Sequence, residues 1–133
     1  MSLRQKHKVW VNTSRNTGMT DLVYGPGETD RLVEHDSFDQ WDGSKIDLAE
    51  SANVDLNLQG IINCKGIYIQ MNGDAKVTIN GSDTPLQLRR YGSTTGVVCK
   101  LFVEADITSV NVENPSGSGA AMAGHFHAWG SSS

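Results

Sequence analysis

The sequence lacks long hydrophobic runs. No apolar stretch in its 133 residues approaches the roughly 18 residues that a membrane-spanning helix needs, and residues 1–6 lack the apolar core of a secretion signal. We therefore expect a protein without membrane contact that is made in the cytoplasm, or one whose signal has been removed.

Cysteine is scarce as well. Cys64 and Cys99 lie 35 positions apart, each inside an apolar run, and this spacing excludes a CxxC-type metal or redox site. Two buried free thiols fit the pattern better than a disulfide between neighbouring strands, although the sequence leaves both open.

Catalytic motifs and helix signals are also missing. The sequence contains no Gly-x-Ser-x-Gly nucleophile elbow and no phosphate-binding glycine loop, and neither cysteine lies in a basic setting that would activate its thiol. No stretch combines a helical apolar stripe with capping residues, although residues 29–34 would allow one or two turns. The sequence does not exclude a pair of carboxylates placed for glycoside hydrolysis, because it has many Asp and Glu residues. We expect a protein that is not an enzyme and needs no cofactor.

The net charge of -4 conceals a separation of charge. Residues 1–20 carry four basic residues and no acid, whereas residues 21–55 carry ten acids against Arg31 and Lys45. This distribution predicts contact with an acidic surface or head-to-tail pairing between copies, and ordinary solvated charge is the alternative.

Nucleic-acid binding is poorly supported. The sequence pI is near 5.4, and Arg89-Arg90-Tyr91 is too small a basic and aromatic cluster for a strand-binding groove. Adjacent residues of a strand point to opposite faces, so one of the two arginines is available to meet the acidic segment, within the chain or across a contact.

Period-two alternation dominates from residue 44 onward. Val54, Leu56 and Leu58, for example, alternate with polar neighbours, which places one face of a strand in a core and the other in water. Turn-forming residues separate such runs at near-regular spacing. We predict an all-β fold, an antiparallel β-sandwich or jelly roll of about eight strands with an extended N-terminal arm. The expected strands are residues 46–48, 54–58, 61–70, 75–80, 86–91, 97–104, 107–113 and 122–129.

One expected strand, residues 97–104, has apolar residues on both faces. Cys99, Leu101 and Val103 share one face, while Phe102 lies among charged residues on the other. The half-polar face predicts a central strand, or a strand packed against a neighbouring subunit.

We divide the chain into three segments of one domain. Residues 1–20 form a basic arm with one strand near residues 7–12, residues 21–43 form an acidic, loop-rich segment around the short candidate strands 22–24 and 32–35, and residues 44–130 form the sandwich core. Long segments like the first two carry function or become ordered on a partner.

A candidate metal site lies near the end of the sequence. His125 and His127 would project from the same face of a strand and could share an ion. The pair resembles the His-x-His opening of cupin-type metalloproteins, but no Glu follows it, so further ligands would have to come from His7, His35 or a distant carboxylate. The alternative is two exposed or partly packed histidines, which would make a subunit contact sensitive to pH.

The acidic run at residues 36–43 suggests calcium. Laid on the twelve-residue calcium loop from Asp39, the sequence fails at positions 3, 5 and 6, which are Trp41, Gly43 and Ser44. We expect a solvated loop that Phe38 and Trp41 anchor to the body, and an irregular calcium site is the alternative. A sugar-stacking surface would draw on Trp41, Tyr68, Tyr91 and Trp129.

Residues 66–69 and residues 107–117, Ile-Thr-Ser-Val-Asn-Val-Glu-Asn-Pro-Ser-Gly, resemble small tailed-phage virion proteins of the jelly-roll decoration or cement type. In those proteins a late strand of pattern Ile-Thr-x-Val-x-Val-x-Asn leads into a Ser/Gly turn and a closing strand, here residues 122–129. The resemblance, which covers about half the chain, implies a structural virion protein that clamps neighbouring capsid subunits and forms homo-oligomers around local symmetry axes.

The implied location is the virion, and the implied partner is the major capsid protein or another virion protein. We expect the basic arm to hold that partner, because aromatic and arginine anchors dominate many protein interfaces. The alternatives are a carbohydrate-binding or receptor-binding β-sandwich module and a cupin-like metalloprotein. The expected arm contacts are Arg4, Lys6, Lys8, Trp10 and Arg15.

Overall fold

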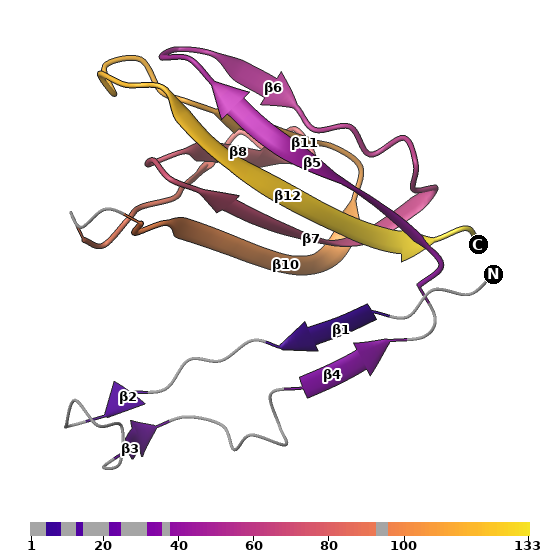
Figure 1. Ribbon diagram of the computed structural model, residues 1–133. Coiled ribbons are helices and arrows are strands. Elements are labelled where there is room, and N and C mark those ends of the chain that lie inside the picture. Colours follow the sequence, from indigo (N-terminus) through magenta and orange to yellow (C-terminus); the bar gives the residue numbers. More distant parts are fainter. Residues whose placement is uncertain (1–4, 9–12, 15–21, 25–31, 36–37, 93–95) are drawn as a thin grey trace. The chain divides into compact units, whose positions relative to one another are not determined.

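The computed structural model divides the chain into two compact units, Met1–Asp39 and Gln40–Ser133 (Figure 1). It describes residues 38–92 and 96–133 in full and the backbone of residues 5–8, 13–14, 22–24 and 32–35. These residues contain strands and no helix. Among them, accordingly, no helical segment has the length and apolarity to cross a membrane.

The first unit contains two small antiparallel sheets. Strand β1 (Gln5–Lys8) pairs with β4 (Leu32–His35), and β2 (Thr13–Ser14) pairs with β3 (Leu22–Tyr24). The candidate strands 22–24 and 32–35 are therefore confirmed. The helical turn considered for residues 29–34 is wrong over residues 32–34, where pairing with β1 holds the backbone extended. The strand expected near residues 7–12 includes residues 7 and 8, and residues 9–12 lie outside the described ranges.

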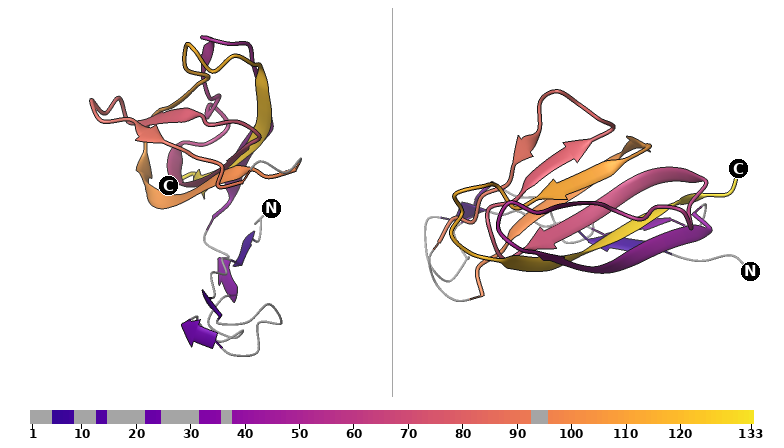
Figure 2. Two further views of the ribbon diagram at one scale, coloured as in Figure 1. Left: turned by 90° about the vertical axis from the view of Figure 1, so that its left-hand side faces the viewer. Right: turned by 90° about the horizontal axis from the view of Figure 1, so that it is seen from above.

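The second unit contains eight strands in two four-stranded antiparallel sheets, one in the order β10-β7-β12-β5 and the other in the order β6-β11-β8-β9. Figure 2 shows these strands from two further directions. The strands are β5 (Gln40–Leu48), β6 (Asn53–Asp55), β7 (Asn63–Met71), β8 (Lys76–Ile79), β9 (Leu86–Gln87), β10 (Cys99–Ile107), β11 (Val110–Glu113) and β12 (Met122–Ser131).

The strand pairing identifies the sandwich as a jelly roll. Strand β5 pairs with β12, β6 with β11, β7 with β10, and β8 with β9. The chain thus runs as one long hairpin that is folded over, and the pairings β7 with β12 and β8 with β11 join its turns into two sheets. The predicted all-β sandwich of about eight strands is confirmed.

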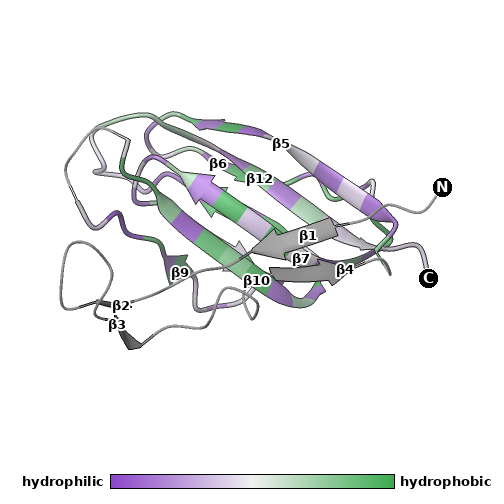
Figure 3. Ribbon diagram, turned by 60° about the horizontal axis from the view of Figure 1, so that its bottom comes forward, coloured by the Kyte–Doolittle hydropathy of each residue, from purple (hydrophilic) through white to green (hydrophobic). Residues whose placement is uncertain are grey.

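Alternate residues of the strands meet between the two sheets and form the core. Phe126, Ile69 and Leu101 lie side by side on β12, β7 and β10, and Val77 and Val112 face them from the second sheet. The alternation is visible along β10 in Figure 3. Among the described residues, the apolar side chains with no measurable exposure are Ile67, Ile69, Met71, Ala75, Val77, Val112 and Ala128.

Strand β5 begins at Gln40, four residues before the expected core boundary, so the loop predicted for residues 36–43 is wrong over residues 40–43. Polar side chains at the start of β5 accept hydrogen bonds from the backbone of the segment at residues 59–62. The Gln40 Oε1 atom accepts the Ile62 N–H (2.7 Å), and the two carboxylate oxygens of Asp42 accept the N–H groups of Gly43 (2.9 Å) and Gly60 (3.3 Å). These bonds let pairing with β12 extend to Gln40.

Strand β10 lies at the edge of its sheet, so the central position considered for residues 97–104 is wrong. Its outer apolar residue, Phe102, lies 5.6 Å from Trp129, measured between ring centroids. The second interpretation of that strand, packing against a neighbouring subunit, stays a prediction.

Both cysteines are free and buried, as the preferred interpretation predicted. Cys64 lies opposite Ile107, whereas Cys99 lies opposite Met71. Cys64 and Met71 are seven residues apart on β7, or about 23 Å at the usual rise per residue. A disulfide, which needs Cα atoms about 5–6 Å apart, is excluded.

Candidate binding face

The expected arm contacts fall largely outside the described residues. Arg4, Trp10 and Arg15 are not described, and Lys6 and Lys8 are described only by their backbone in β1, where they pair with Glu34 and Leu32. Their role in binding a partner stays a prediction.

The outer face of the sheet β10-β7-β12-β5 carries a cluster of rings. Pairing places Trp129 between Gly66 and Trp41, and His127 between Tyr68 and Gly43. Phe102 pairs with Tyr68 on the far side of β7. We call this cluster the aromatic face, and it consists of Trp41, Tyr68, Phe102, His125, His127 and Trp129.

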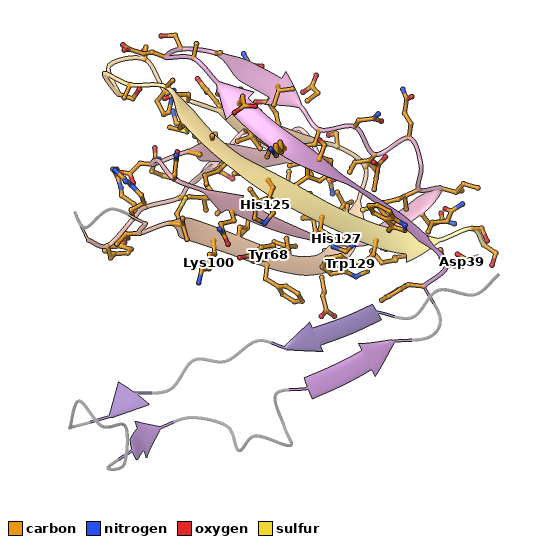
Figure 4. All side chains as sticks on the ribbon, viewed as in Figure 1. Asp39, Tyr68, Lys100, His125, His127 and Trp129 are labelled. Carbon is orange, nitrogen blue, oxygen red and sulfur yellow. The ribbon has the colours of Figure 1, made fainter. Side chains whose placement is uncertain are left out.

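The rings of the aromatic face contact one another across three strands. The ring centroid of His127 lies 5.7 Å from that of Trp41 and 5.9 Å from that of Trp129, both in edge-on geometry. Trp129 also contacts Phe102 at an interplanar angle of 36°. Figure 4 shows Tyr68, His127 and Trp129 close together on the sheet. These contacts link rings from β5, β10 and β12 into one row.

A second ring contact lies beside this row. The rings of Tyr68 and His125 are 6.2 Å apart, and the Tyr68 hydroxyl donates a hydrogen bond to Gln70 Oε1 (2.8 Å). Pairing places His125 between Gln70 and Lys45, and Lys100 lies opposite Gln70 on β10. The lysines therefore give the aromatic face a basic border on this side.

Exposure differs across the aromatic face. Trp41 is 56% exposed, His125 and His127 are also exposed, and Trp129 is only 2% exposed. Partial burial removes water from His127 and lowers the pKa of its imidazole. Burial likewise raises the pKa of the Tyr68 hydroxyl. The exposed rings can thus meet a partner, while Trp129 forms their support.

The outer face of the other sheet has a different composition. Asn111 on β11 donates hydrogen bonds from Nδ2 to Asn53 Oδ1 (3.0 Å) and Asp55 Oδ1 (2.9 Å) on β6. Lys76 and Thr78 lie on the same face, on β8. No aromatic residue belongs to the described strands of that face. The two sides of the sandwich therefore present unlike surfaces, one polar and one rich in rings.

His125 and His127 lie on the same face of one strand, as predicted, but no further metal ligand lies beside them among the described residues. His125 and His127 point from the same face of β12, where their register partners on β7 are Gln70 and Tyr68. Among the described residues, no three His, Cys, Asp or Glu side chains converge to hold a metal ion. His7 and His35 are described only by their backbone.

The acidic run at residues 36–43 has a different role from the one expected. Asp42 uses both carboxylate oxygens as acceptors for backbone N–H groups. Trp41 does not anchor a loop to the body, because it lies on a strand and is 56% exposed. Its pairing partner on β12 is Trp129, which makes it part of the aromatic face.

Sequence reasoning named most members of the aromatic face without bringing them together. Period-two spacing predicted that His125 and His127 share one face of a strand, Trp129 was named only as a candidate for sugar stacking, and Phe102 indicated an apolar residue on the outer face of a second strand. The missing information was the pairing of β7 with both β10 and β12, which connects residues separated by more than 20 positions.

Comparison of the chain with models of protein families, with curated proteins and with solved structures gives no match.

Proposed function

We propose that this chain is a structural virion protein of the decoration or cement type, which binds neighbouring subunits of a capsid shell through its aromatic face. The observation that carries the proposal is the difference between the two outer faces of the sandwich. Aromatic side chains concentrate at protein interfaces, whereas a hydrogen-bonded layer of Asn and Asp suits contact with water.

The fold is consistent with this proposal. Jelly rolls occur in viral capsid proteins, in lectin domains and in cupins. The fold is therefore compatible with each of these three functions, and the site has to distinguish them. The resemblance of residues 107–117 to phage virion proteins favours the first of these. The partner would be the major capsid protein or another virion protein, and the location would be the virion.

The alternatives have weaker support. Stacking on successive sugar rings requires exposed, aligned aromatic rings. On the aromatic face, Trp41 is largely exposed, but Trp129 is buried and its ring is tilted by 36° from that of Phe102. A cupin-like metal site would need a ligand in addition to His125 and His127, and the described residues supply none.

The test is sedimentation of the purified protein with capsid shells from the same phage. Trp41→Ser should weaken binding about 30-fold, equivalent to about 2 kcal/mol, because an exposed aromatic anchor is removed. Tyr91→Ser is the matched control, since Tyr91 is 91% exposed but lies outside the aromatic face. Equal binding by the wild type and Trp41→Ser would contradict the proposal, as would a glycan array that gave hits lost in Trp41→Ser.

The basic arm makes a separate contribution under this proposal. Deletion of residues 1–15 removes Arg4, Trp10, Arg15 and the two lysines of β1. The deleted protein should retain the β-type circular dichroism spectrum of the sandwich and should no longer sediment with shells. Unchanged sedimentation would remove the arm from the proposal and leave the aromatic face as its basis.

A further inference from the structure

A groove lies at the end of the sandwich where β7 ends and β12 begins. Its volume is about 510 Å³, within the range of sites that hold a small ligand or a few side chains. The β7–β8 turn and the residues after β9 form one wall, and the loop before β12 forms the other. The lining residues are Asn72, Gly73, Asp74, Gln87, Arg89, Arg90, Pro115, Ser116, Gly117, Ser118, Ala120, Ala121 and Met122.

Three charged residues line the groove. Asp74 Oδ2 lies 3.7 Å from Arg89 Nη1, and Asp74 Oδ1 lies 4.0 Å from Arg90 Nε. Asp74 Oδ1 also accepts the backbone N–H of Arg90 (2.8 Å). One carboxylate therefore lies within ion-pair distance of two guanidinium groups, and these three residues give the lining a net charge of +1.

The two guanidinium groups have donors to spare. Each carries five N–H donors in a planar fork, and neither donates a hydrogen bond to any residue in the described part of the chain. Both are partly exposed, with 58% of the Arg89 side chain and 39% of the Arg90 side chain accessible. The geometry of such a fork suits a second carboxylate.

The opposite wall is held in place. Asn114, at the start of the loop, donates hydrogen bonds from Nδ2 to Leu48 O (3.2 Å) at the end of β5 and to Ala120 O (2.8 Å) near the end of the loop. Gly117, at φ +87°, donates its N–H to Glu50 Oε1 (3.2 Å). The groove is therefore formed before any ligand arrives.

We propose that this groove binds the acidic stretch at residues 21–39 of a second copy of the chain. That stretch carries Asp21, Glu28, Asp30, Glu34, Asp36 and Asp39 against Arg31, a net charge of -5. Its charge is opposite to that of the groove, and carboxylates are groups that the planar arginine fork binds through two parallel hydrogen bonds. A contact between unlike surfaces of identical chains builds head-to-tail oligomers. This inference uses a different surface from the one in the proposed function and can fail independently of it.

The experiment measures the mass of the full chain in solution by light scattering and sedimentation velocity. At about 50 mM NaCl the wild type should have a multiple of its 14.4 kDa mass, and at about 500 mM NaCl it should shift toward the monomer, because salt screens charge pairs. The double variant Arg89→Gln, Arg90→Gln should be monomeric in both buffers. The control variant Lys45→Gln, Lys100→Gln removes the same charge from the aromatic face and should keep the mass of the wild type.

A second variant tests the other side of the contact. Glu34→Lys with Asp36→Lys should also give a monomer, and its combination with Arg89→Glu and Arg90→Glu should restore the oligomer. A wild type that is monomeric at about 50 mM NaCl would overturn the inference, and so would an oligomer that survives either double variant. Loss of the oligomer in the lysine control would overturn it as well, because the groove would then not be the determinant.

Discussion

The indole ring of Trp129 lies against the backbone of Gly66, its partner on the neighbouring strand β7. A Cβ atom at residue 66 would overlap Cε2, Cζ2 and Nε1 of the indole. Because residue 66 is a glycine, the indole of Trp129 has room to lie over β7. Its ring centroid there is 5.6 Å from that of Phe102 and 5.9 Å from that of His127. One glycine therefore supports the whole row of rings.

Gly66→Ala should displace Trp129 and lower the free energy of unfolding by about 1–3 kcal/mol, the usual cost of overpacking. Urea denaturation followed by tryptophan fluorescence measures this. In a Trp129→Ala background the same change should cost much less, because the overlapping ring is gone. An equal cost in both backgrounds would contradict the assigned contact.

Acid should destabilise the protein through His127. Burial lowers the pKa of this imidazole in the folded state, so the unfolded chain binds a proton at higher pH than the folded chain. The stabilising contribution is complete above about pH 6.5 and is lost as the pH falls below it. Thermal melts between about pH 8 and pH 5 should show a smaller decrease of Tm for His127→Gln than for the wild type.

The exposed His125 on the same strand provides the control for that experiment. His125→Gln should keep the acid-induced decrease of Tm, since the partly desolvated ring of His127 is still present. If the decrease of Tm persisted in His127→Gln and disappeared in His125→Gln, His125 would be its cause and the prediction would be contradicted.

Neither cysteine should react in the folded protein. Burial raises the pKa of both thiols, and their Sγ atoms face backbone carbonyls, Cys99 at 3.2 Å from Gly73 O and Cys64 at 3.5 Å from Gly66 O. Titration with a thiol reagent at about pH 8 should find no reactive thiol in native protein and two in denaturant. Rapid labelling of the native protein would contradict the packing of β7 and β10.

Asn114→Ala should lower the free energy of unfolding by about 2–3 kcal/mol, because two hydrogen bonds of a fully buried amide are lost. Chemical denaturation measures the change. The control is Asn57→Ala, in which an exposed side chain loses one bond to the Gln59 N–H, and it should change stability by about 0.5 kcal/mol. Similar values for both variants would show that Asn114 does not hold its loop.

Several strands were predictable because they alternate between side chains that face the core and side chains that face the outside. Val77 and Ile79 alternate with polar residues, and this local pattern needs no knowledge of a partner strand. The order of the strands was not predictable in this way. Placing Phe102 beside Trp129 requires β7 to lie between β10 and β12, which is decided by packing across distant parts of the chain.

The start of β5 shows a second limit of local reasoning. Gln40 to Gly43 contains Asp and Gly, which favour turns in isolation, yet these residues form a strand. Hydrogen bonds from the segment at residues 59–62 reverse the local preference. Trp41 was therefore assigned to a loop, although it belongs to the aromatic face.

Those same bonds affect how copies of the molecule can crowd together. An edge strand with unpaired N–H and C=O groups can pair with a strand of another chain, and repeated pairing of this kind builds fibres. The amide oxygen of Gln40 and the carboxylate of Asp42 hold the Gly60 and Ile62 amides beside the start of β5 and occupy the Gly43 amide. At residues 40–43 of this edge strand, a neighbouring molecule would therefore find polar side chains and the segment at residues 59–62 already hydrogen-bonded, which disfavours pairing of another copy with the start of β5.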